Sequence, residues 1–166
     1  MIIAQSLGSL PVRGSVTWLT DWACGMPLIV VTVLIHVLGL VLARWGVLRV
    51  WRRTTRHYRP TTVFVSVIAL MTLLAASLHA IEATVWAVAY RILGALPDNR
   101  SAMLYSLNAL TSYGHTNLRL DDRWHLMGAI EALNGELLFG LSTAFLFAVI
   151  GRVLAWLDDR PQHNRL

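Results

Sequence analysis

The sequence predicts a small all-α integral membrane protein with three transmembrane helices and a short helix between the second and the third. Hydrophobic residues make up 56% of the 166-residue chain and charged residues only 14%, and the mean hydropathy is positive. Three apolar stretches are each long enough to cross a bilayer core, which takes about 20 helical residues. Between the last two lies a polar, glycine-containing segment, residues 105–118. We expect it to be a re-entrant loop, because irregular backbone at membrane depth must be buried in protein or line an aqueous path.

The first span is expected at residues 27–43 and ends at Arg44. All fourteen basic residues are arginines, and six of them lie between Arg44 and Arg59. Short basic loops stay on the cytoplasmic side of a membrane, so the amino terminus is expected outside and the carboxyl terminus in the cytoplasm. We therefore interpret the net charge of +5 as a topology signal in a bacterial inner-membrane protein and expect no nucleic-acid partner.

Residues 1–24 contain Trp18 and Trp22 and are expected to form an outer interfacial segment. Cys24 is the only cysteine, which excludes an intrachain disulfide and a multi-cysteine metal site within one chain. The chain is thus divided into residues 1–24, an additional span with its basic loop (25–60), a pore domain (61–157) and a cytoplasmic tail (158–166).

The second span is expected to begin at Pro60, a residue favoured in the first helical turn, and to run to about residue 93. The third is expected at about residues 124–156. Between them, Asp98, Asn99 and Ser101 offer N-caps for a helix over residues 100–111. That helix is too short to cross a membrane, and its carboxyl end would favour a cation.

Two spans that flank a short helix and a polar loop resemble the pore module of tetrameric potassium channels, and the likeness covers residues 101–144. It is strongest to short bacterial ion-channel-domain proteins with one additional amino-terminal span. The resemblance implies a homotetramer, with Gly135 in the place of the gating hinge. The residues in the selectivity-filter places, where the family has Thr-Thr-Val-Gly-Tyr-Gly, are Thr111, Ser112, Tyr113, Gly114, His115 and Thr116.

This loop departs from the family pattern in its outer half. Thr116 occupies a glycine place, where a β-branched residue at positive φ is strained, so potassium selectivity does not follow from the resemblance. His115 occupies the tyrosine place. Its imidazole either packs behind the loop or forms a ring of four near the axis that responds to pH or binds metal.

Glu136, Phe139 and Thr143 share one face of the third span. In the family, that face lines the aqueous cavity, and four Glu136 carboxylates would concentrate cations there. The alternative is a carboxylate paired with a polar group at a helix interface.

Five further polar residues are expected at the level of the loop, where they would support its backbone. The sequence places no third ligand beside His79 and Glu82, so no metal site is assigned. His36 stands alone in the first span and is interpreted as a packed histidine. The residues of the expected buttress are His79, Glu82, Asn108, Glu131 and Asn134.

The function expected from these observations is passive conduction of monovalent cations, with K⁺ the candidate ion, by a homotetramer in contact with lipid. This needs no cofactor and no enzymatic chemistry. One alternative is a non-conducting structural or regulatory membrane subunit with the same fold. A weaker alternative is a membrane metalloenzyme or proton relay that uses His79, Glu82, His115 and Glu131.

Overall fold

The computed structural model of the protein describes residues 12–54, 60–114 and 118–158. In these residues all regular structure is helical: α1 (Val12–Thr54), α2 (Pro60–Ile92), α3 (Asn99–Leu110), the short 3-10 helix η1 (Asp122–Trp124) and α4 (His125–Asp158). Three segments are long and apolar enough to cross a membrane, namely Trp18–Val47, Thr61–Ile92 and Asp122–Ala155. The predicted all-α chain with three spans is therefore confirmed, and the protein is a multi-pass membrane protein.

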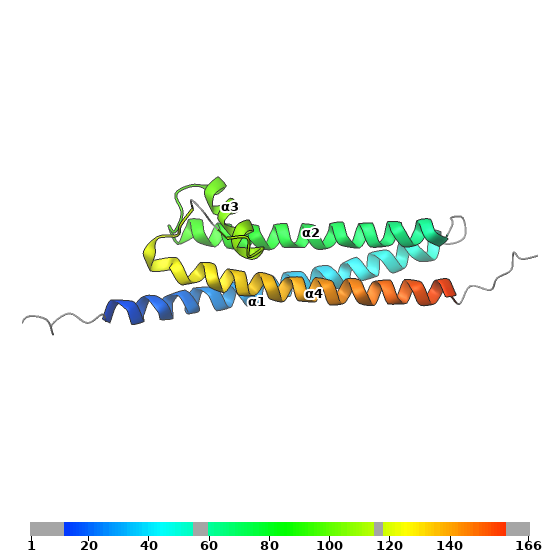
Figure 1. Cartoon of the computed structure of the whole chain (residues 1–166), viewed down its shortest axis with the longest axis horizontal. Coiled ribbons are helices and arrows are strands. Elements are labelled where there is room, and N and C mark those ends of the chain that lie inside the picture. The colour runs from blue at the N-terminus through cyan, green and yellow to red at the C-terminus, as the bar shows by residue number, and fades with distance from the viewer. Residues whose placement is uncertain (1–11, 55–59, 115–117, 159–166) are drawn as a thin grey trace, which may run out of the picture.

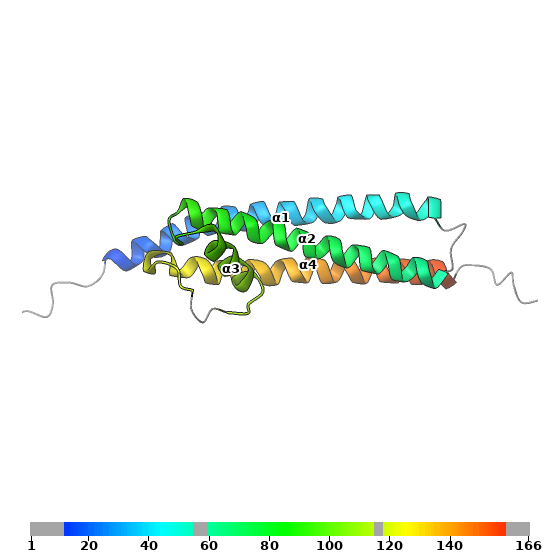
Figure 2. The ribbon, with the colours of Figure 1, turned by 90° about the horizontal axis from the view of Figure 1, so that it is seen from above.

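The three long helices lie side by side along the long axis of the molecule (Figures 1 and 2). α3 packs against α2 and α4 near the end of the bundle where α2 ends and α4 begins. The shape is thus a three-helix bundle that carries a short helix against one side of one end.

The helix boundaries agree closely with the sequence for α2 and α4 and less well for α1. α2 begins at the predicted Pro60 and ends at Ile92. α1 begins at Val12, so the described part of the expected interfacial segment is continuous with the first span. With 43 residues, α1 is about 65 Å long and extends well beyond a hydrocarbon core of about 30 Å.

The start of α3 is capped as its sequence predicts. The Asp98 side chain accepts a hydrogen bond from the backbone N–H of Ser101 at 2.9 Å. This bond lowers the pKa of the Asp98 carboxyl below its ordinary value of 3.8. The buried face of α3 follows the helical repeat and consists of Ala102, Tyr105, Ser106, Ala109 and Leu110.

The segments on either side of α3 meet at one end of the bundle. The N–H of Asp121 lies 3.4 Å from the carbonyl oxygen of Ala95, which joins the chain leading into α3 to the chain leaving it. The last residue of α3, Leu110, lies instead against Gly135 of α4. Gly135 is ten residues after His125, the start of α4, or about 15 Å along that helix.

Aromatic side chains fill the space between α3 and the long helices. Tyr90 and Tyr105 are buried edge to face, with ring centroids 5.3 Å apart. Trp86, Trp124 and Met127 belong to the same core cluster. α3 is therefore held by packing as well as by its polar contacts.

Candidate functional site

The carboxyl end of α3 is closed by a Schellman motif. The N–H of Ser112 donates to the Ala109 carbonyl at 2.9 Å, and the N–H of Tyr113 donates to the Asn108 carbonyl at 3.0 Å. Ser112 has φ 54°, a left-handed conformation that this motif usually assigns to glycine. The turn redirects the chain immediately after Thr111, at the first of the predicted filter positions.

The residues after this turn are exposed in the single chain. Tyr113 is 84% exposed, and Gly114 is exposed with φ 85°. His115 and Thr116, the outer positions of the predicted filter, lie outside the described residues. Of the six predicted filter positions, the structure therefore describes the first four, Thr111 to Gly114.

Gly135 allows the backbone of α3 to touch α4. A β-carbon on Gly135 would lie 1.9 Å from the Leu110 carbonyl oxygen and 2.7 Å from its carbon. Both atoms belong to the backbone, so no side-chain rotation relieves the overlap. The sequence places Gly135 at a hinge, and the structure gives a further reason for glycine at this position.

Glu131 is a polar link between α3 and the long helices. It is fully buried in α4, and its Oε2 accepts a hydrogen bond from the Tyr90 hydroxyl of α2 at 2.6 Å. Its Oε1 is in contact with the Ser106 hydroxyl of α3. The same hydroxyl lies 2.7 Å from the Ala83 carbonyl of α2. One carboxyl group thus connects three helices.

The hydrogen bonds of Ser106 restrict the protonation state of Glu131. The Ser106 hydroxyl has one proton, which it gives either to Ala83 or to Glu131. If it donates to the Ala83 carbonyl, the contact with Glu131 requires the carboxyl itself to donate as a neutral acid. A neutral acid is also the form that costs least to bury.

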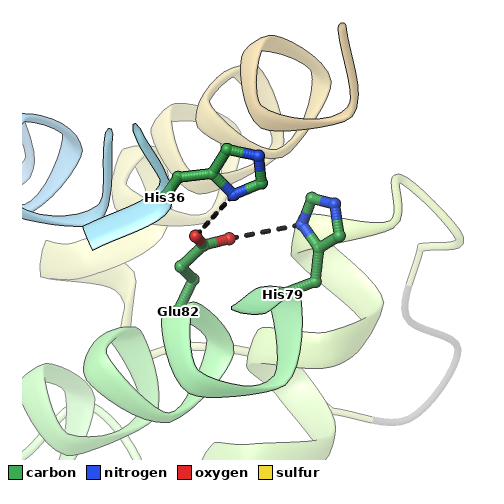
Figure 3. A group of neighbouring side chains, drawn as sticks. All are labelled: His36, His79 and Glu82. Atoms are coloured by element: carbon green, nitrogen blue, oxygen red, sulfur yellow. Dashed lines mark hydrogen bonds and ion pairs between the residues drawn. The ribbon is translucent and has the colours of Figure 1, made fainter. Parts of the chain in front are cut away.

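His36, Glu82 and His79 form a second buried cluster, between α1 and α2. Figure 3 shows the Glu82 carboxylate between the two imidazole rings. His36 Nδ1 lies 2.7 Å from Glu82 Oε1, and His79 Nδ1 lies 3.2 Å from Glu82 Oε2. Both His36 and Glu82 are fully buried, and His79 is 13% exposed.

Ser142 of α4 closes this cluster from the opposite side. Its hydroxyl oxygen lies 3.1 Å from His36 Nε2 and 3.2 Å from His79 Nε2. The four side chains therefore join α1, α2 and α4. We call His36, His79, Glu82 and Ser142 the histidine cluster.

The predicted buttress residues lie in several places. Glu131 contacts α3, whereas the contacts of His79 and Glu82 run to the histidine cluster. Asn134 is buried in α4 and donates through Nδ2 to the Thr32 hydroxyl of α1 at 2.8 Å. Asn108 is half-buried in α3, where its carbonyl accepts from Tyr113.

Several hydrogen-bond partners of these residues were not predicted from the sequence. His36 is buried as expected but is not isolated, since Glu82 and Ser142 bind it. A usable signal was present, because Thr32 and His36 are four apart and share a helical face. Asn134 and Ser142, eight apart in α4, share a face in the same way and meet those two residues.

The predicted cavity residues of α4 lie on its exposed face in the single chain. Glu136, Phe139 and Thr143 are all exposed. The Phe139 ring stacks on the His79 ring at 4.4 Å between centroids, with 19° between the planes. The exposed face of α4 is thus in direct contact with the histidine cluster.

Comparison with known proteins adds no assignment to these sites. The chain matches no protein-family model, and no curated protein and no solved structure is detectably similar to it.

Proposed function

We propose that the protein is the subunit of a homotetrameric cation channel, in which α3 is a re-entrant pore helix and the residues after it form the selectivity filter. The tetramer would place four copies of α4 around an axis, as in the pore module that the sequence resembles. A single chain has too few helices to enclose a pore.

The observation that carries this proposal is the contact between the end of α3 and Gly135. Gly135 lies inside the candidate span Asp122–Ala155, about 15 Å from the start of α4. If that span crosses the bilayer, the turn from Ser112 to Gly114 lies at membrane depth. Irregular backbone at that depth is tolerated when it lines water or is buried in protein, and Tyr113 is exposed in the single chain.

The electrostatics of this region favour a cation. The carboxyl end of a helix carries roughly half a negative charge, and α3 ends at the turn. Carbonyl oxygens beyond the turn would replace the water around a permeating ion. K⁺ is the first ion to test, because the resemblance is to potassium channels.

Glu136 supports an aqueous cavity beyond the filter. It is exposed on α4, one residue after Gly135 and therefore deep within the candidate span. A carboxylate facing lipid at that depth is costly, whereas one facing a water-filled cavity is not. Thr143 is exposed two helical turns further along and adds a polar group.

We place the protein in a bacterial inner membrane with its amino terminus outside. The support is the group of six arginines from Arg44 to Arg59, which begins in the last part of α1 and favours the cytoplasmic side. In this orientation α3 and its flanking segments reach the membrane from outside.

The test is ion flux through purified protein in liposomes, with K⁺, Na⁺ and an impermeant cation compared at several pH values. We expect cation flux in the wild type and a lower flux in Glu136→Gln. The reduction should be largest at low salt, because ionic screening weakens a ring of charges. Asp122→Asn, which removes an exposed carboxylate in η1, just before α4, is the matched control.

Absence of flux for every cation and pH would reject conduction and favour the non-conducting subunit. The filter assignment has its own test, since His115→Tyr combined with Thr116→Gly moves the loop toward the family pattern. This double variant should change the ratio of K⁺ to Na⁺ flux. An unchanged ratio in a conducting protein would show that the loop is not the filter.

A further inference from the structure

We propose that the histidine cluster is a binding site for a divalent transition-metal ion of the Zn²⁺ class, held by His36, His79 and Glu82. The three residues offer two imidazole nitrogens and a carboxylate oxygen, and these ligand atoms all lie within 4.8 Å of one another. Imidazole and carboxylate are ordinary ligands of Zn²⁺. The proposal does not depend on whether the protein conducts ions.

The hydrogen bonds of the cluster can be assigned to donors and acceptors one by one. The ionised Glu82 carboxylate only accepts, so His36 must donate to it through Nδ1–H. A neutral His36 then accepts at Nε2, and the donor is the Ser142 hydroxyl. Ser142 has no second proton to donate, so His79 must donate to it through Nε2–H.

If His79 is neutral like His36, this assignment leaves its Nδ1 without a proton. The atom faces Glu82 Oε2, another acceptor, at 3.2 Å. Among the described residues, neither atom has a hydrogen-bond partner, and both are buried. Two buried acceptors in contact repel each other, and the carboxylate charge is uncompensated. The cluster therefore needs one more positive charge between these atoms.

A metal ion would supply that positive charge between His79 and Glu82, and His36 would be its third ligand. Around a tetrahedral Zn²⁺ with bonds of about 2.0–2.1 Å, neighbouring ligand atoms lie roughly 3.4 Å apart, so small side-chain shifts suffice. His36 would change tautomer, with its proton on Nε2 in place of Nδ1, so that the unprotonated Nδ1 can bind the ion. Both rings could then donate through Nε2–H to Ser142, whose oxygen accepts two bonds.

The surroundings fit an ion held for structure or regulation. The three ligands come from α1 and α2, and Ser142 adds α4, so a bound ion would fasten the three spans together. His79 is the one ligand with some exposure, beside the Phe139 ring. This is the side from which an ion would reach the cluster.

The first experiment measures retained metal. Full-length protein in detergent is stripped with a chelator, incubated with Zn²⁺ and desalted, and metal per chain is determined by mass spectrometry. We expect one Zn²⁺ per chain in the wild type and its loss in Glu82→Gln and His36→Ala. His125→Ala, which removes an exposed histidine at the start of α4, should keep the ion. Equal retention in all four proteins would overturn the site.

The second experiment looks for the appearance of an absorption band. A misfolded variant could lose bound metal, but it would not produce this band. In a Cys24→Ser background, His79→Cys should give a thiolate-to-metal charge-transfer band when Co²⁺ is added. Ser77→Cys, exposed on the same helix, should give none. Ser142→Ala should weaken Co²⁺ affinity by about 10- to 100-fold, the usual effect of removing an outer partner.

The result that rejects the proposal is a wild-type protein that retains neither Zn²⁺ nor Co²⁺. The missing positive charge would then be a proton shared within the cluster. A wild type that binds Co²⁺ while His79→Cys gives no charge-transfer band would also overturn the proposed ligand set.

Discussion

The backbone of Gly135 lies directly against the carbonyl oxygen of Leu110, with no space for a side chain between α4 and the end of α3. This contact fixes how far α3 extends along α4. It therefore also fixes the level of the turn that begins at Ser112.

Gly135→Ala should displace the end of α3 or destabilise the protein. The new methyl group would meet backbone atoms that cannot rotate away, and overpacking of this kind costs about 1–3 kcal/mol. Thermal unfolding in detergent measures the effect. Gly140→Ala in the same helix is the control, because a β-carbon there has open space and should be neutral or stabilise by up to about 1 kcal/mol. Equal melting temperatures in the two variants would contradict the close contact.

Glu131→Ala should weaken the attachment of α3 to the bundle and destabilise the protein. It leaves the buried Tyr90 hydroxyl without its acceptor, and each buried polar group left unpaired costs about 1–3 kcal/mol. Glu131→Gln should cost less, since its amide can still accept from Tyr90 and donate to Ser106. Melting temperatures in the order wild type, Gln, Ala are expected. If the Gln variant is as unstable as the Ala variant, the carboxyl is required as an ion.

Because Asp98 caps α3, the free energy of unfolding of the protein should depend on pH. The hydrogen bond from Ser101 lowers the pKa of this carboxyl below 3.8, so the folded state favours the ionised form. The contribution is complete above the unfolded pKa and is lost as the pH falls through the lowered folded value. Asp98→Asn keeps a capping oxygen and should remove this part of the acid dependence. Melting curves recorded from neutral to acid pH test this, and identical acid slopes in both proteins would exclude the cap as their source.

The proposed cavity predicts that Thr143 is accessible to water in the assembled protein. In a Cys24→Ser background, Thr143→Cys should react with a water-soluble thiol reagent in liposomes, because thiols react as thiolates and these form in water. Leu42→Cys on α1, which is 71% exposed in the single chain, should face lipid and react far more slowly. Comparable rates at both positions would argue that α4 does not line a cavity.

The helices could be read from the sequence because their signals are local. Pro60 is the first residue of α2, as predicted. Asp98 caps α3, which begins at Asn99, one residue before the predicted start. Long apolar runs likewise determine where the spans lie. These features depend on neighbouring residues and need no knowledge of how the helices face one another.

The polar contacts between helices could not be read in this way. Glu82 meets His36 across 46 residues of sequence, and Ser142 meets His36 across 106. Such pairs depend on the rotation of each helix about its axis. Apolar residues surround these spans on all sides, so the hydrophobic pattern does not show which face is inside. For this reason the contacts of Glu82 with α1 and of His79 with α4 could not be predicted from the sequence.

The polar contacts of α1 have a consequence for the order in which the helices assemble during synthesis. Thr32 and His36 are partners of Asn134 in α4 and of Glu82 in α2. Proteins generally fold from the amino terminus during synthesis, so α1 is present in the membrane before either partner emerges. When α2 and α4 enter the membrane, Glu82 and Asn134 can therefore bond to α1, whereas exposure of these polar side chains to lipid would be costly. Removal of α1 should therefore impair the insertion of α2 and α4 themselves, which makes the first span an internal template for assembly of the other two.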